Sequence, residues 1–119
     1  MVDARRHEVY YAMYRPVPGG LQRISGYELG KAETVAGELQ SRREEAIVAG
    51  DGAERFSDVF ADLDRVELAG ASYAVPSLAA LVEIAAGCYE REQFVSASEV
   101  TPMYLRRSDA EIALGPRAV

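Results

Sequence analysis

The sequence predicts an α/β fold, and three observations support this class. Strand-forming residues around a turn predict an antiparallel hairpin between residues 9 and 29. Strand and helix patterns then alternate as far as Tyr89, which is the order expected when helices pack in layers on a sheet. Of the 119 residues, 49% are hydrophobic, so one domain of this length can build a core.

The hairpin is predicted from two stretches of strand residues. Residues 9–14 are rich in β-forming side chains that alternate between two faces. Residues 15–20 hold two prolines and two glycines and predict the turn, because proline fixes φ and glycine tolerates positive φ. Residues 21–29 are the returning strand, which Gly26 weakens and can interrupt with a bulge.

A helix and a buried strand are expected next. Residues 31–43 predict an amphipathic helix whose Val35 and Leu39 face the core. The run Ala-Ile-Val-Ala at residues 46–49 contains no polar side chain. Such a run is typical of a strand that is buried on both faces of a sheet.

A second helix is predicted at residues 51–62. Asp51 and Glu54 have the spacing of a capping box with Asp51 as the N-cap. Apolar side chains then recur at helical intervals: Phe56, Val59, Phe60 and Leu63. Residues 66–68 predict a short strand after this helix.

A third helix and a tail complete the chain. Pro76 suits a first helical position, and the helix is expected to lie against the sheet through apolar residues at helical spacing: Leu78, Leu81, Val82 and Ala85. The tail, residues 95–119, is expected to be extended and anchored by Tyr104 and Leu105.

The predicted order is two strands followed by helix, strand, helix, strand and helix. A ribonuclease H-like lobe has this order with one more strand in front, for which only residues 1–3 remain. We therefore expect residues 1–119 to form one ribonuclease H-like lobe, with a mixed sheet, an N-terminal hairpin, three helices and a truncated first strand. A truncated strand would leave backbone groups beside the hairpin unpaired, and such an edge recruits another strand.

Two motifs near the ends carry a family resemblance. Residues 3–10 read Asp-Ala-Arg-Arg-His-Glu-Val-Tyr, and residues 102–106 read Pro-Met-Tyr-Leu-Arg. They resemble the segments that open and close the second lobe of a bacterial family in the actin-like ATPase superfamily. This family is the dimerisation subunit of the tRNA threonylcarbamoyladenosine biosynthesis machinery. The resemblance covers nearly all of the chain but about half of a family member, so we expect a fragment that lacks the first lobe.

The resemblance implies a non-catalytic scaffold. The threonylcarbamoyl transfer to an adenosine next to the anticodon of tRNA would belong to a partner, with no cofactor or metal on this chain. The implied partners are the catalytic transferase subunit and the ATPase subunit, reached through the first lobe, with homodimerisation as a further possibility. The motif residues carried over as structural or partner-contact positions are Arg5, Glu8, Tyr10, Tyr104, Leu105 and Arg106.

The alternative is a freestanding metal-dependent nuclease or phosphatase of the same fold. Asp3 and Asp51 would hold two divalent metals at the strand ends, with Glu38 on the intervening helix. Local turn bonds for Asp3 and a helix cap for Asp51 are the favoured interpretation. Gly50-Asp51-Gly52 likewise predicts a tight turn, because a phosphate loop would need a further glycine and a lysine.

Charge and composition exclude several classes. The formal net charge of −6 repels nucleic acid over long range, so no direct tRNA binding is expected. Tyrosines on the first strand favour packing over base stacking, and the arginine pairs at 5–6 and 106–107 favour local ion pairs. His7 and Cys88, the only histidine and cysteine, cannot make a zinc site alone. No apolar run could span a bilayer, and we expect a cytoplasmic protein.

Overall fold

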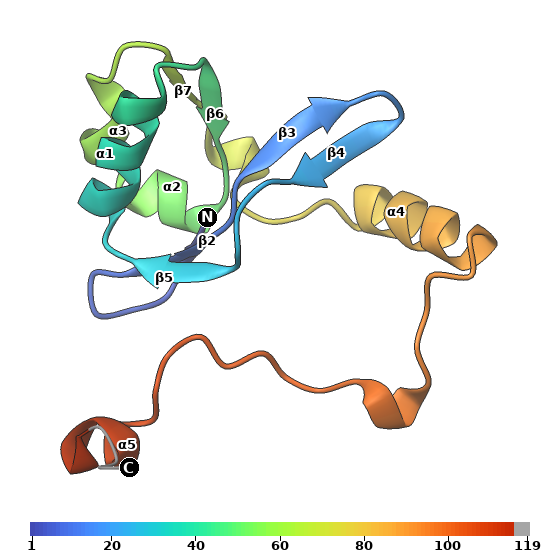
Figure 1. Ribbon diagram of the computed structural model, residues 1–119. Coiled ribbons are helices and arrows are strands. Elements are labelled where there is room, and N and C mark those ends of the chain that lie inside the picture. Colours follow the sequence, from blue (N-terminus) through green and yellow to red (C-terminus); the bar gives the residue numbers. More distant parts are fainter. Residues whose placement is uncertain (116–119) are drawn as a thin grey trace.

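The structure is a computed structural model of the chain and describes residues 1–115. It has a mixed α/β architecture with three small sheets and five α-helices within that range (Figure 1). The elements follow in this order: β1 (Val2–Asp3), β2 (Val9–Tyr11), β3 (Tyr14–Val17), β4 (Gly20–Arg23), β5 (Glu28–Gly30), α1 (Ala32–Arg42), β6 (Ala46–Val48), α2 (Asp51–Arg55), α3 (Ser57–Ala61), β7 (Val66–Leu68), 3-10 helix η1 (Ala71–Tyr73), α4 (Leu78–Glu90), 3-10 helix η2 (Ala97–Glu99) and α5 (Asp109–Leu114).

The first sheet has the order β1-β2-β5 and is antiparallel throughout. β1 is only two residues long and pairs Val2 with Tyr10 and Asp3 with Val9. On its other edge β2 pairs with β5, with Tyr10 opposite Leu29. The predicted antiparallel hairpin is therefore confirmed, and β2 is the central strand of this sheet.

The hairpin is longer than predicted and interrupted in the middle. β3 and β4 form a separate two-stranded ribbon, so the turn lies within the expected residues 15–20 but is shorter, with the chain reversing at Pro18 and Gly19. Pro16 is tolerated inside β3 because this exposed ribbon leaves strand edges where a missing N–H is not needed. The returning arm breaks between β4 and β5, where Gly26 lies, as predicted.

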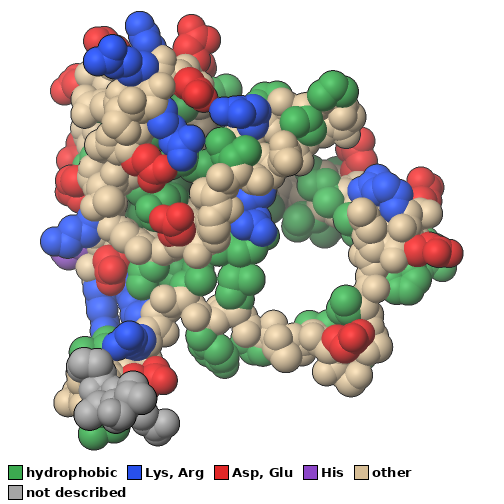
Figure 2. Space-filling view, in the orientation of Figure 1, with side chains coloured by type: hydrophobic (Ala, Val, Ile, Leu, Met, Phe, Trp, Pro, Cys, Tyr) green, Lys and Arg blue, Asp and Glu red, His purple; other side chains and the backbone are tan. Residues whose placement is uncertain are grey.

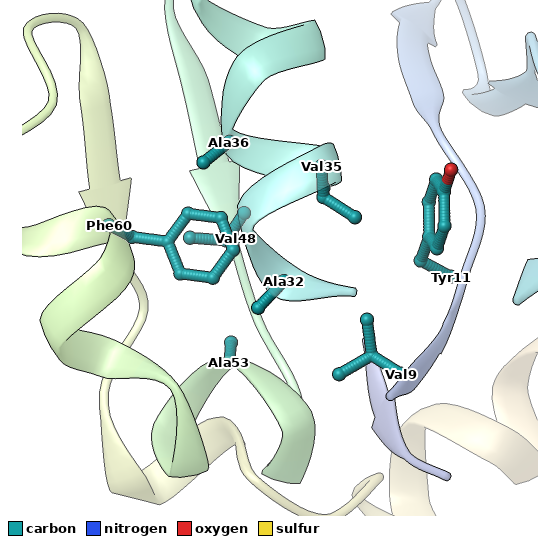
Figure 3. Close-up of a cluster of buried hydrophobic side chains, with 8 residues drawn as sticks. All are labelled: Val9, Tyr11, Ala32, Val35, Ala36, Val48, Ala53 and Phe60. Atoms are coloured by element: carbon teal, nitrogen blue, oxygen red, sulfur yellow. The ribbon is translucent and has the colours of Figure 1, made fainter. Parts of the chain in front are cut away.

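β6 and β7 form a parallel pair that is covered on one side only. α1 connects the hairpin to β6, within one residue of its predicted bounds. The prediction that residues 46–49 are buried on both faces is wrong, because Val48 is buried whereas Ile47 is 70% exposed. Val48 points toward Phe60 and Ala36 on the helices (Figure 3), and β7 pairs with one edge of β6.

The predicted helix at 51–62 is two short helices. α2 ends and α3 begins around Phe56, whose backbone leaves the helical region at φ −109° and ψ 30°. The bend lets α3 bury Phe60 completely. The predicted capping box is also wrong, since Gly50 is the N-cap and no side chain caps α2.

The core gathers where these elements meet. Its two largest fully buried side chains are Phe60 and Val9. In Figure 3, Phe60 points from α3 toward β6 and α1, and Val9 faces the start of α1 from β2. The cluster comprises Val9, Tyr11, Ala32, Val35, Ala36, Val48, Ala53 and Phe60.

α4 departs from the prediction most. It begins after Ser77, whose hydroxyl accepts from the Ala80 N–H at 3.4 Å, so Pro76 lies before the cap. The helix stands away from the sheets (Figure 1), and its expected contact residues are exposed: Leu81 by 51% and Val82 by 60%. The expectation that α4 packs on the sheet is therefore wrong for this chain by itself.

The C-terminal segment makes the molecule open. The chain after α4 arches away from the body and returns to it at α5, which leaves a gap in the space-filling view (Figure 2). The Cα radius of gyration is 16.8 Å, against about 13.5 Å for a compact domain of this length. Among the described residues, no helix has the length and apolar character needed to cross a membrane.

Candidate partner-facing site at the β1–β2 turn

The β1–β2 turn, residues 4–8, has an unusual backbone. Arg5, Arg6 and His7 all have positive φ, at 65°, 52° and 58°. The turn is closed by the Ala4 N–H donating to the Glu8 carbonyl and the Glu8 N–H donating to the Arg5 carbonyl, both at 2.9 Å. A left-handed backbone at a non-glycine residue costs on the order of 1 kcal/mol of folding free energy, and such residues cluster at functional sites. This turn is therefore a candidate functional site.

Arg106 holds this turn from the far end of the chain. Its guanidinium donates to the Ala4 carbonyl at 2.7 Å and to the Arg5 carbonyl at 3.3 Å. The same group forms an ion pair with the Glu8 carboxylate at 2.7 Å. Both side chains of the pair are mostly shielded from solvent, with 20% and 30% exposure. We call these three interactions the Arg106 clamp.

Two neighbouring contacts extend the clamp along the tail. The Arg6 guanidinium pairs with the Asp109 carboxylate at 2.8 Å, and this hydrogen bond raises the pKa of Arg6. Leu105 is half-buried and lines a cleft of about 230 Å³ together with Tyr10. The segment 105–109 is thus laid across β1, β2 and their turn.

The structure therefore brings together most of the motif residues carried over from the resemblance. Arg5, Glu8 and Arg106 meet at the clamp, and Tyr10 and Leu105 line the adjoining cleft. Tyr104 does not join them: its side chain is 85% exposed, so the expectation that it anchors the tail is wrong. Arg106 is the anchor because a guanidinium can reach two carbonyls and a carboxylate at once.

The carboxylates of the enzymatic alternative already form hydrogen bonds and ion pairs within the chain. The Asp51 carboxylate accepts from the Asp3 N–H at 2.9 Å, and the Asp3 carboxylate accepts from the Arg5 N–H at 3.0 Å and pairs with Arg55 at 3.1 Å. The Arg5 backbone bond, aided by the charge of Arg55, lowers the pKa of Asp3. Glu38 pairs with Arg42 along α1 at 2.9 Å.

No three metal-binding side chains converge within residues 1–115. The arrangement of Asp3, Asp51 and Arg55 instead links β1 to α2. His7 lies in the β1–β2 turn and Cys88 on α4, which stands apart in Figure 1, so the fold does not pair them as nucleophile and base.

The Gly50-Asp51-Gly52 turn lies close against the backbone at the start of β1. Gly50 has φ 109°, and a Cβ there would overlap the Met1 carbonyl oxygen. At Gly52 a Cβ would lie 3.0 Å from the Val2 backbone and 3.1 Å from Val9. The predicted tight turn is thus present, and its glycines serve the close approach of β1 to α2.

Of the hairpin tyrosines, Tyr11 packs in the core, whereas Tyr14 is 51% exposed. Tyr11 is buried, and its hydroxyl donates to the Glu28 carboxylate at 2.9 Å. Burial, followed by the hydrogen bond to Glu28, raises the pKa of Tyr11 to about 12. A stacking platform for bases would need this ring exposed.

Two helices of the tail, η2 and α5, were not predicted from the sequence. η2 and α5 each begin with a complete capping box, Ser96 with Glu99 and Ser108 with Glu111. Both have the Ser-x-x-Glu pattern in the sequence, which marks the start of a helix and could have predicted them. The expectation of an extended tail at 95–119 is thus wrong at these helices, and residues 116–119 lie outside the described part.

No protein-family model matches the chain, and no curated protein matches its sequence.

Proposed function

We propose that the chain is the second lobe of a non-catalytic scaffold subunit in the complex that forms threonylcarbamoyladenosine next to the anticodon of tRNA. The observation that carries the proposal is the Arg106 clamp. It joins the two segments that bear the family resemblance, residues 3–10 and 102–106, although Arg106 and Glu8 lie 98 positions apart. Because the same hydrogen bonds and ion pair connect the two motifs in the fold, their resemblance to the family is stronger together than two unconnected motif matches would be.

The strand arrangement also supports a ribonuclease H-like lobe. The first sheet has the order β5-β2-β1, and the Met1 nitrogen at the start of β1 donates to the Ala49 carbonyl just after β6 at 2.6 Å. With β7 parallel to β6, the five strands follow the spatial order β5-β2-β1-β6-β7. α1 connects the two groups of strands, and α2 with α3 connect β6 to β7.

The chemistry of the clamp suits a scaffold. The polar groups of the clamp bond to one another. Of the neighbouring carboxylates, Asp51 accepts from the Asp3 N–H and Asp3 forms an ion pair with Arg55. The transfer reaction would belong to the catalytic subunit. The ATPase subunit and a second scaffold subunit are the other expected partners, and the net charge of −6 argues against direct contact with tRNA.

Reconstitution tests the proposal. The catalytic and ATPase subunits are combined with tRNA, a separately expressed first lobe of the family and this chain in place of the second lobe. We expect mass spectrometry of digested tRNA to detect threonylcarbamoyladenosine. Arg106→Gln should lower the yield, whereas Arg107→Gln, at an exposed neighbouring arginine, should not. A complex of the two lobes that assembles without supporting modification would refute the function.

The metal-dependent alternative has its own test. Because Asp3 and Asp51 already bond to backbone and arginine, we expect no saturable heat on titration of the chain with magnesium, alone or with ATP. Saturable binding that disappears in Asp51→Asn would instead favour the nuclease or phosphatase.

A further inference from the structure

The helix α4 is apolar on every side although it stands in solvent. Its only charged side chains are Glu83 and Glu90, and its large apolar side chains are exposed: Val82 by 60%, Ile84 by 64% and Tyr89 by 73%. A helix that is apolar all round is normally buried against other elements. In Figure 1, α4 lies away from the sheets, so it lacks the neighbour that its composition requires.

The N-terminal body carries an exposed aromatic patch. Tyr10 points away from the core, because the side chains before and after it on β2 are buried in the core and alternate residues of a strand face opposite sides. It lines the cleft of about 230 Å³ described above. We give the name tyrosine patch to Tyr10 and the other large apolar side chains of this cleft that lie outside the core: Val2, Tyr14, Tyr27 and Leu105. Val2, Tyr14 and Tyr27 are 46–55% exposed.

The charges at the tyrosine patch and on α4 are complementary. The Arg23 guanidinium carbon lies 4.2 Å from the centre of the Tyr27 ring, at the rim of the patch. This group donates to the Ser25 carbonyl at 2.6 Å but forms no ion pair within residues 1–115. In the same range, Glu83 and Glu90 form none either. The patch thus presents an uncompensated guanidinium, and the helix presents uncompensated carboxylates.

The exposed area of the chain is large enough for a stable dimer. The accessible surface is 9508 Å², whereas a compact monomer of this length exposes about 6,300 Å². The excess of about 3,200 Å² is larger than the roughly 1,000–2,500 Å² that each subunit contributes to the interface of an obligate homodimer.

We propose that two copies of this chain form a symmetric dimer in which each places α4 on the tyrosine patch of the other. Glu83, in the middle of the helix, would face Arg23 of the second copy. A second copy fits because one chain carries both surfaces, apolar and of opposite charge, so a two-fold axis makes the same contact twice.

The exchange requires no unfolding. The helix already stands away from its own body (Figure 1), and the core cluster contains no residue of α4. In dilute solution the chain is the open monomer described above, and the dimer forms as the protein concentration rises. This inference goes beyond the proposed function and does not depend on it.

The first test measures association of the whole chain by sedimentation velocity over a wide range of protein concentration. We expect a monomer–dimer equilibrium. Arg23→Glu and Glu83→Arg each place like charges at the contact and should weaken association by about tenfold or more. Asp58→Arg is the control for Glu83→Arg, because it changes the net charge equally at an exposed position of α3. It should dimerise as the wild type does.

A mixture of the two variants tests the exchange itself. In a mixed dimer, one contact joins the Glu83 and Arg23 that remain, and the other joins the two introduced side chains, which again have opposite charge. We therefore expect an equal mixture of Arg23→Glu and Glu83→Arg to dimerise as tightly as the wild type, although neither variant does so alone. Hydrogen exchange in α4 should slow in the wild type and in the mixture as the dimer forms. Melting curves confirm that both variants fold.

Four outcomes would overturn the proposal. A wild type that stays monomeric, with fast exchange in α4 at every concentration, would exclude the dimer. Slow exchange in α4 of a monomer would show that the helix folds back on its own patch. A dimer that neither substitution weakens, or variants that do not recover on mixing, would place the contact elsewhere. Protection of α4 only after a separately expressed first lobe is added would make that lobe the occupant.

Discussion

The two ends of the chain use similar apolar patterns with opposite results. All nine buried hydrophobic side chains among residues 1–115 lie between Ala4 and Phe60. After α3, apolar residues are as frequent, yet α4 exposes Leu78 by 76% and Ile84 by 64%. Helical spacing therefore predicts the helix correctly in both regions, but it does not establish that a surface to pack against is present in the same chain.

The regions also differ in what stabilises them. In the N-terminal body, residues 1–68, strand pairing and the core join segments that are distant in sequence. In the C-terminal arm, residues 71–115, the helices themselves are stabilised locally: Ser77, Ser96 and Ser108 each cap a helix that follows directly. Short helices held by caps alone are marginal in water, so the arm depends on its contacts with the body.

The largest expected difference in the free energy of unfolding comes from shortening one side chain in each region. Phe60→Ala should lower the free energy of unfolding by about 3–5 kcal/mol, because it leaves a cavity in the core. Leu81→Ala, on the exposed face of α4, should change it by no more than about 0.5 kcal/mol. Urea denaturation followed by circular dichroism measures both.

A large effect of Leu81→Ala would contradict this contrast. A loss of several kcal/mol would mean that α4 packs on the body in solution, as its sequence pattern alone predicts. Phe60→Ala serves as the internal control for a core position in the same experiment.

The second contrast compares two glycines within the body. Gly50→Ala should destabilise the protein by about 2 kcal/mol or more, since φ is positive there and a Cβ would overlap the Met1 carbonyl. Gly37→Ala lies in α1, where nothing outside the adjoining helix backbone comes within 4 Å of the new Cβ, so it should stabilise by about 0.5–1 kcal/mol. Thermal melting of the two variants should therefore shift in opposite directions, and a shift in the same direction would show that β1 does not approach Gly50.

The differences between sequence and structure have the same physical origin. The hairpin, α1 and β7 could be predicted because their signals are local: alternation, helical periodicity and turn residues. The break at Phe56 could not, because it depends on how α3 reaches the core with Phe60. The Arg106 clamp joins residues 98 positions apart, and periodicity carries no information about such a pair.

The site itself was predictable in part. The motif resemblance selected Arg5, Glu8 and Arg106, which the structure brings together. It also selected Tyr104, which is exposed, because a motif identifies positions and not which side chain has a partner. The pairing of Arg6 with Asp109 had no signal beyond opposite charge.

The third prediction tests the connection between the regions. Arg106→Gln removes the ion pair with Glu8 and should cost about 1–2 kcal/mol, since both side chains are largely shielded. The effect should be concentrated in the arm, with faster hydrogen exchange in residues 97–114 and little change in β2 or α1. Arg107→Gln, at an exposed position, is the matched control; equal effects of the two variants would show that charge alone, and not the clamp, holds the arm.

The smallest effect concerns the titration of one core hydroxyl in the body. Burial, together with the bond to Glu28, raises the pKa of Tyr11 from 10.0 to about 12. Between these two values the unfolded chain loses the Tyr11 proton while the folded chain keeps it, so unfolding releases a proton and becomes more favourable as the pH rises. The stabilising contribution is therefore complete below pH 10 and is lost on approaching pH 12.

Denaturation of the wild type and of Tyr11→Phe across this range measures the contribution. At neutral pH the variant should be less stable by about 1 kcal/mol, because it lacks the hydrogen bond to Glu28. The difference should shrink from pH 10 toward pH 12, since only the wild type carries a proton at this position to release. Any pH-dependent contribution that the two proteins share cancels in the difference. A stability difference that is constant with pH would show that Tyr11 is not held in the core, and it would weaken the division of the chain into a packed body and an open arm.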